Sequence, residues 1–224
     1  AKMSNFIPEG GIWMNTERPE WNDANNALVG NGVSMVTLYY LRRFLRFFET
    51  VVINSESTDF HVSKELHLFF NQVTAGLQKH KSLLSGTVSD ADRKRIMDVL
   101  GEAGSLYRNT IYDNRFSGDK NLLSKDDLLT FLNVANAFLE HSIEANKRKD
   151  NLYHAYNLMT VNGSDEVRIS HLPEMLEGQV AVLSSGYLAA KESLDVLDGL
   201  KASALFRPDQ YSYILYPNKE LPRF

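Results

Sequence analysis

The sequence predicts an all-α fold: a single α-helical domain over residues 1–224, with six helices and one short β-hairpin. Three observations carry this prediction. Apolar residues recur at three- and four-residue spacing over long segments. Serine and aspartate N-cap signals precede several of these segments. The strand–helix–strand alternation of parallel α/β folds is missing. The expected helices cover residues 23–52, 62–84, 89–113, 124–149, 173–190 and 193–204.

Local signals justify the first three helices in order. Asp23 is a plausible N-cap for the first helix, which places Leu38, Leu41 and Leu45 on one apolar stripe. The second helix covers residues 62–84. The third begins at Ser89, where Ser89-x-x-Asp92 resembles a capping box with aspartate in place of glutamate.

The second half of the chain has its own start and turn signals. Ser124-x-x-Asp127 opens the fourth helix in the same way as Ser89 opens the third. Residues 153–169 form the expected hairpin, since Asn162-Gly163 is a typical two-residue hairpin turn. Pro173 fits the first position of the fifth helix, and a shorter sixth helix follows it.

Composition narrows the function classes. The net charge of −4 and the pI near 5.9 argue against a polyanion-binding protein, so no nucleic-acid partner is expected. No apolar run approaches the roughly 20 residues of a membrane span, so no membrane partner is expected. There is no cysteine, which excludes disulfides and thiolate chemistry and leaves the localisation open. The N-terminus lacks a signal-peptide pattern.

Metal and cofactor motifs are missing from the sequence. The six histidines never form an HExxH arrangement, and His61 and His67 are six positions apart, which is not one helical face. Ser184-Ser185-Gly186 is not the Gly-x-Ser-x-Gly nucleophile motif, and no phosphate-binding glycine loop with a following lysine occurs. We therefore predict neither a metal site nor a cofactor.

One segment, residues 13–26, concentrates the groups that carbohydrate chemistry needs. It holds carboxylates, an arginine, two tryptophans and four asparagines within a loop and the start of a helix. Carboxylates and amides pair with vicinal hydroxyls, and indole rings cover the apolar face of a pyranose. A carboxyl group beside an indole also suits a general acid. Composition alone leaves another interpretation open, in which Asp23 caps the helix, Glu20 pairs with Arg18 and the tryptophans are core.

The order of residues in this segment resembles a known family. The run Glu20-Trp21-Asn22-Asp23 is followed by Asn26, Gly30-Asn31-Gly32 and Ser34. It is similar to the Asp-Trp-Asn-Asp segment of cellobiose- and chitobiose-phosphorylase-type enzymes, which are six-hairpin (α/α) toroid glycosidases in the broad sense. The resemblance implies that Asp23 is the general acid, that Trp21 contacts the sugar, and that this chain is about half of such a toroid.

Two further patches follow in the family's order. Residues 178–186, with Gln179, are similar to the family's Ala-Gln-Ser-Trp-Ala-Val-Leu-Ser-Gly stretch, and residues 213–217 resemble its Tyr-Pro-Pro loop. Four departures stand beside them. Glu20 replaces the family's first aspartate, Val33 replaces a glutamate, and Val180 replaces the family's Ser-Trp pattern after Gln179. The family's phosphate-binding Gly-Gln-Tyr-x-His stretch does not occur, so phosphorolysis has no visible support.

The resemblance implies an inverting glycoside hydrolase or phosphorylase-like enzyme acting on an oligosaccharide or disaccharide, with water or phosphate as the acceptor. The implied site residues are Asp23 as the acid and Trp21, Glu20, Asn22, Arg18, Glu17 and Gln179 as substrate contacts. The chain is expected to be a fragment of a larger catalytic domain, and its parent an enzyme. The alternative is a non-catalytic helical module that binds sugar or another protein. Were the chain complete, the uncovered apolar faces of half a toroid predict a homo-oligomer.

Overall fold

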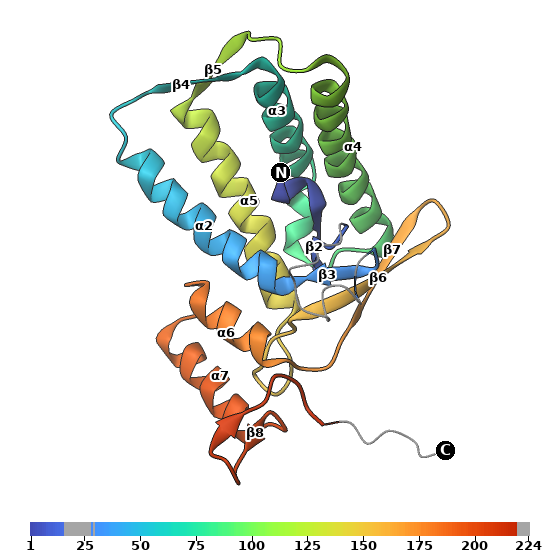
Figure 1. The fold of residues 1–224 in the computed structure, drawn as a ribbon, viewed down its shortest axis with the longest axis vertical. Helices are drawn as coiled ribbons and strands as arrows, with labels where there is room; N and C mark the ends of the chain where they lie inside the picture. Colours follow the sequence, from blue (N-terminus) through green and yellow to red (C-terminus); the bar gives the residue numbers. More distant parts are fainter. Residues whose placement is uncertain (16–27, 29, 219–224) are drawn as a thin grey trace.

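The computed structural model describes residues 1–15, 28 and 30–218, and over these residues helices and antiparallel strands are mixed (Figure 1). Four long helices lie on one side of a curled five-stranded antiparallel sheet, and two shorter helices lie on the other. The predicted all-α fold, with helical hairpins forming about half of a toroid and one short β-hairpin, is therefore wrong. A sheet formed by segments from both ends of the chain connects the helices.

The helices lie close to their predicted positions. The four long ones are α2 (Met35–Ile53), α3 (Lys64–Lys79), α4 (Asp90–Asn114) and α5 (Lys125–Ala145), and the shorter ones are α6 (Leu176–Ser184) and α7 (Ala190–Ala202). Two 3₁₀ turns, η1 (Lys2–Asn5) and η2 (Lys81–Ser85), accompany them. The hydroxyl of Ser89 accepts from the Asp92 amide and that of Ser124 from the Asp127 amide, so both predicted caps are confirmed.

Three predicted helix starts are corrected. Ser34 caps α2, so this helix starts well after Asp23, and residue 23 itself lies outside the described residues. The fifth predicted helix begins at Leu176 rather than at Pro173. Residues 62–63, predicted as helical, belong to a strand that pairs across to the start of α5.

The main sheet has the order β1-β2-β3-β6-β7. Its strands are β1 (Phe6–Ile7), β2 (Gly11–Trp13), β3 (Gly32–Ser34), β6 (Tyr156–Asn162) and β7 (Glu166–His171). The predicted hairpin is present as β6–β7, with Gly163 at φ +59° in its turn, but it joins a larger sheet because β3 pairs with β6. Two small pairs complete the strands: β4 (Asp59–Ser63) with β5 (Lys120–Ser124), and β8 (Phe206–Arg207) with β9 (Ser212–Tyr213).

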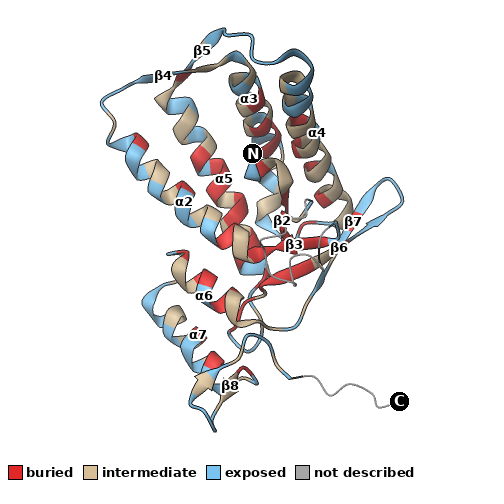
Figure 2. Ribbon diagram, in the orientation of Figure 1, coloured by how far each residue is buried: buried red, intermediate tan, exposed pale blue. Residues whose placement is uncertain are grey.

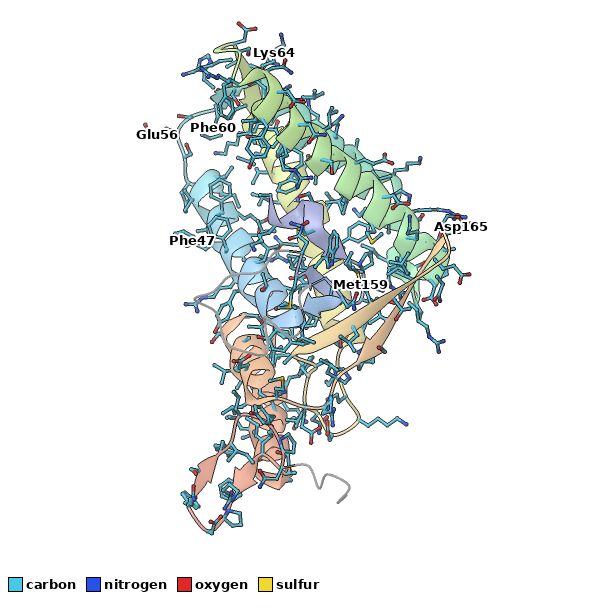
Figure 3. All side chains as sticks on the ribbon, turned by 45° about the vertical axis from the view of Figure 1, so that its right-hand side comes forward. Phe47, Glu56, Phe60, Lys64, Met159 and Asp165 are labelled. Atoms are coloured by element: carbon cyan, nitrogen blue, oxygen red, sulfur yellow. The ribbon has the colours of Figure 1, made fainter. Side chains whose placement is uncertain are left out.

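The buried residues gather on the facing sides of the four long helices and at the middle of the sheet (Figure 2). A second small cluster, in which Val33, Met159 and Val167 are buried, lies on the sheet, with Met97 of α4 packed against it. Figure 3 labels Met159, which lies within β6, and Asp165, at the tip of the β6–β7 hairpin. Burial of each large apolar side chain contributes about 1.5–3 kcal/mol, so the sheet is tied firmly to the helices.

A buried ion pair fixes the turn between β1 and β2. Glu9 lies in this turn at φ +58°, and its Oε2 accepts a 2.6 Å hydrogen bond from the Arg93 guanidinium of α4. The same guanidinium donates to the backbone carbonyls of Pro8 and Val167, each at 2.9 Å. Helix α4 therefore holds β2 in place against the hairpin β6–β7. Residues 13–26, the segment predicted from the sequence to bind a sugar, begin at the end of β2.

Candidate functional site

Most of the predicted site residues lie outside the described residues. These are Glu17, Arg18, Glu20, Trp21, Asn22 and Asp23. The structure places the two ends of the segment that contains them, and it places Gln179 in full. The described residues that contact the two ends of this segment therefore define the candidate site.

Both ends of the segment are fixed at one edge of the β2–β3 pair. The Met14 amide donates to the Gly32 carbonyl at 2.9 Å, and the Gly30 amide donates to the Met14 carbonyl at 2.8 Å. The indole Nε1 of Trp13 donates to the Gly30 carbonyl at 2.9 Å. Gly30 has φ +89°, a conformation that favours glycine. Met14 and Gly30, at the two described ends of the segment, are thus held side by side.

The return strand β3 leads directly into α2 and into the middle of the chain. The Ser34 hydroxyl accepts from the Thr37 amide at 3.0 Å and caps α2. The amides of Met35 and Val36 both donate to the carbonyl of Ala155, at 2.9 and 3.2 Å. The segment Tyr153–Tyr156 consequently lies against the first turn of α2. This turn directly follows Gly32 and Ser34 of the first family-like patch.

Helix α6, which carries the second patch, lies against the same segment. Gln179 is fully buried, and its Oε1 accepts from the Tyr153 amide at 2.8 Å. Its Nε2 donates to the carbonyls of Tyr153 and Met175 at 2.7 and 3.0 Å. The amide group of Gln179 is thus occupied by backbone partners. In the described structure the Gln179 side chain links the backbone of residue 153 to that of residue 175 rather than facing a cavity.

The third patch returns to the start of α6. The Leu176 amide donates to the carbonyl of Leu215 at 2.8 Å, and the Ile214 amide donates to the carbonyl of Leu205 at 2.9 Å. Residues 213–217 therefore cross the N-terminal end of α6, one turn from Gln179. We call the segment Tyr153–Tyr156 the junction. Ser34, at the described end of the first patch, pairs with Tyr156, and Gln179 of the second patch binds Tyr153. The third patch contacts the start of α6, the helix that carries Gln179.

Polar side chains at the junction include a tyrosine–glutamate pair that the sequence analysis did not select. The Tyr156 hydroxyl donates to Glu177 Oε2 at 2.7 Å, and Tyr156 itself is buried. Glu177 directly precedes the Gly178-Gln179 patch, and this adjacency was the available signal. Tyr156 carries no such signal, because a tyrosine in an amphipathic strand is typical of ordinary packing.

Two stacked histidines lie next to this pair. The rings of His154 and His171 are 4.1 Å apart between centroids and 10° from parallel. His154 Nδ1 contacts the Leu172 carbonyl at 3.1 Å, so this nitrogen carries the proton. Burial, with a smaller contribution from the charge of His171, lowers the pKa of His154 to about 4. Burial also lowers the pKa of His171. His154 is therefore neutral at neutral pH.

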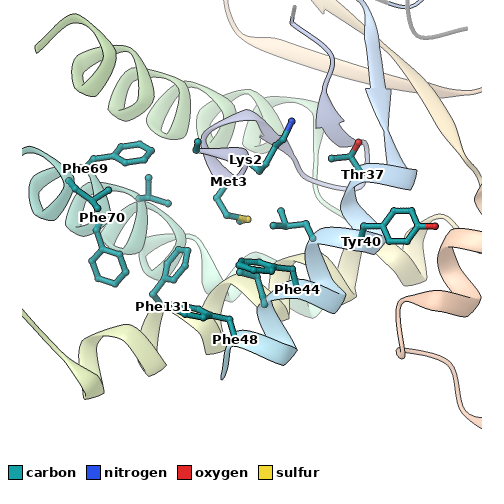
Figure 4. A pocket seen from close by; sticks show the side chains of 14 residues that line it. Lys2, Met3, Thr37, Tyr40, Phe44, Phe48, Phe69, Phe70 and Phe131 are labelled. Atoms are coloured by element: carbon teal, nitrogen blue, oxygen red, sulfur yellow. The ribbon is translucent and has the colours of Figure 1, made fainter. Parts of the chain in front are cut away.

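A separate groove of about 610 Å³ lies between η1, α2, α3 and α5 (Figure 4). Its wall is mainly apolar and aromatic and includes Phe44, Phe48, Phe69, Phe70 and Phe131. Hydroxyl-rich ligands need many hydrogen-bonding partners, and this groove offers few. Its chemistry does not match the sugar site predicted from the sequence. On the outer face of α2, Phe47 adds to the exposed apolar surface (Figure 3).

Over the described residues, no group of three or more histidine, aspartate or glutamate side chains is placed to hold a metal ion. None of the helices in the described ranges is long and apolar enough to cross a membrane. No protein-family model matches the chain, and no curated protein matches it.

Proposed function

We propose that this chain is part of a carbohydrate-active enzyme in which the segment Glu17–Asp23 binds a disaccharide or oligosaccharide. Asp23 protonates the glycosidic oxygen in an inverting cleavage, and Trp21 covers one face of a sugar ring. Glu17, Arg18, Glu20 and Asn22 hold hydroxyl groups or tune the acid. Water or phosphate is the acceptor.

One observation supports the proposal: described parts of the three patches that resemble the enzyme family lie close to the junction. Ser34 of the first patch pairs with Tyr156, Gln179 of the second binds Tyr153, and Leu215 of the third binds the start of α6, the helix that carries Gln179. A chance likeness in three separate stretches gives no reason for them to share one place in the fold. A common ligand site does give such a reason, since substrate contacts must converge from distant parts of the chain.

The chemistry at the junction is consistent with a sugar ligand. Both hydrogen-bond donors and acceptors are present there: the Tyr156–Glu177 pair and the neutral imidazoles of His154 and His171. A neutral histidine accepts a hydrogen bond from a hydroxyl through its unprotonated nitrogen. This set suits a neutral, hydroxyl-rich ligand, which needs donors and acceptors together.

Intrinsic fluorescence tests the proposal, because the chain has only two tryptophans, Trp13 and Trp21. Titration with cellobiose or N,N′-diacetylchitobiose is expected to give a saturable change in emission. The change is expected to persist in Trp13→Phe and to vanish in Trp21→Phe. The proposal fails if neither disaccharide changes the emission, or if Trp13 alone carries the change.

The role of Asp23 is tested separately from binding. Asp23→Asn is expected to keep the fluorescence response to the disaccharide and to abolish cleavage, measured as release of reducing sugar with and without phosphate. Equal cleavage by the variant rules out Asp23 as the acid. Binding without cleavage by the unaltered chain favours the alternative of a sugar-binding module.

A further inference from the structure

A second cavity, of about 690 Å³, lies between α4 and the N-terminal segment that runs from η1 through β2. We call it the α4 cleft. Its lining includes Asn5 and Asn15 from the N-terminal segment and Gly101, Glu102 and Arg108 from α4. Its volume falls in the range of about 300–1,000 Å³ that is typical of small-molecule sites.

Two glycines in the middle of α4 line this cleft, and only one of them has a packing reason. A Cβ on Gly104 would lie 2.8 Å from the Cβ and Oγ atoms of Ser4, so the close approach of η1 requires this glycine. A Cβ on Gly101 would meet nothing within 4 Å. A glycine inside a helix costs about 0.5–1 kcal/mol relative to alanine. Gly101 therefore keeps space open at a cost in helix stability.

The walls of the cleft combine aromatic and polar groups. Trp13 is half-buried with its indole nitrogen bonded to Gly30, and Tyr107 stacks on Phe69 with centroids 4.9 Å apart. Asn15 Nδ2 donates to Asn5 Oδ1 at 2.9 Å, which fixes two amides at the rim. Rings beside amides and hydroxyls are the combination that pyranose units bind.

The charges in the cleft favour a neutral ligand. Two carboxylates, Asp98 and Glu102, and one guanidinium, Arg108, line it. Asp98 pairs with Lys94, whereas neither Glu102 nor Arg108 has an ion-pair partner among the residues that the structure describes. With Asp98 paired, the charges of Glu102 and Arg108 balance, so the cleft has no net charge that would favour an ion. A neutral hydroxyl-rich ligand can accept from the Arg108 guanidinium and donate to the Glu102 carboxylate.

We propose that the α4 cleft is a subsite for further sugar units, so that the substrate is an oligosaccharide longer than a disaccharide. This rests on the proposed function, because Asn15 at the rim of the cleft directly precedes residues 16–27, which carry the proposed sugar contacts.

The test compares a tetrasaccharide with its disaccharide, using cellotetraose against cellobiose and the tetramer of N-acetylglucosamine against its dimer. In at least one series the tetramer is expected to bind about tenfold more tightly by calorimetry, which corresponds to roughly 1.4 kcal/mol. Gly101→Leu fills the cleft and is expected to remove this gain while leaving disaccharide affinity unchanged. Asn109→Leu is the matched control, since Asn109 is exposed on the same helix and does not line the cleft.

A second variant keeps the test decisive if Gly101→Leu disturbs α4. The double variant Glu102→Ala, Arg108→Ala removes two exposed polar groups of the cleft and is expected to abolish the same gain. The subsite is ruled out if neither series shows a gain in the unaltered chain, or if the gain survives both variants. A tetramer that binds through the cleft without any dependence on Trp21 would keep the subsite and overturn the proposed function instead.

Discussion

At the scale of single residues, Arg93 shows how hydrogen bonds stabilise a buried charge. Its side chain is 5% exposed, and it donates to the Glu9 carboxylate and to the carbonyls of Pro8, Val88 and Val167. A buried guanidinium is costly unless its donors are satisfied, and removing one partner of such a pair costs about 3–5 kcal/mol. Glu9, the ion-pair partner, lies 84 positions away in the sequence.

The separation of two partners along the sequence decides whether their interaction could be predicted. The caps at Ser89 and Ser124 were predicted correctly because the hydroxyl and the amide it binds lie three positions apart. The Arg93–Glu9 pair and the Tyr156–Glu177 pair were not predicted, since nothing local marks either partner. The role of Asp23 rests on a resemblance and stays a prediction.

The pKa of His154 predicts a pH dependence of stability. The pKa is about 4 in the folded chain, whereas an unfolded histidine titrates near 6.5. Between these values the unfolded chain binds a proton that the folded chain does not, so stability is full above about pH 6.5 and falls as the pH drops toward 4.

We expect the urea midpoint to fall less over this range in His154→Gln than in the unaltered chain. His61→Gln, at an exposed position on β4, is the control and is expected to keep the original pH dependence. An equal fall in His154→Gln and the unaltered chain would contradict the assignment.

At the scale of elements, substitution of two helical glycines by alanine is predicted to change the free energy of unfolding in opposite directions. In α4, Gly101→Ala adds a methyl group into open space and is expected to raise the free energy of unfolding by about 0.5–1 kcal/mol. In α6, a Cβ on Gly178 would lie 3.0 Å from the Ala155 Cα and 3.1 Å from its nitrogen. Because backbone atoms cannot move aside cheaply, Gly178→Ala is expected to lower that free energy. Urea unfolding measures both, and shifts of the same sign would refute this packing.

The helices could be predicted from the sequence and most strands could not. Helix periodicity repeats over 16 or more residues in each of the four long helices. Strands β1, β2 and β3 have two or three residues each, too few to display alternation. They become strands only because they pair with one another and with β6. The hairpin β6–β7 was predictable because its Asn162-Gly163 turn is a local signal.

At the scale of the whole molecule, the sheet is what makes a shared site possible. Strand β3 pairs with β6 and leads into α2, while the segment before β6 receives α6 and, through it, the C-terminal strands. The junction thus contacts β3 and α2 from the first part of the chain and α6 from the last part, and the C-terminal residues contact α6. The all-α prediction missed the sheet that joins these segments.

The central claim, that the three patches form one carbohydrate site, is tested most directly by hydrogen–deuterium exchange with and without saturating cellobiose or N,N′-diacetylchitobiose. We predict slower exchange in three separate regions at once: residues 16–34, residues 173–179 and residues 211–217. Residues 59–70, at the far end of the bundle, are expected to stay unchanged. Protection confined to one of the three regions, or found only outside them, would contradict the claim.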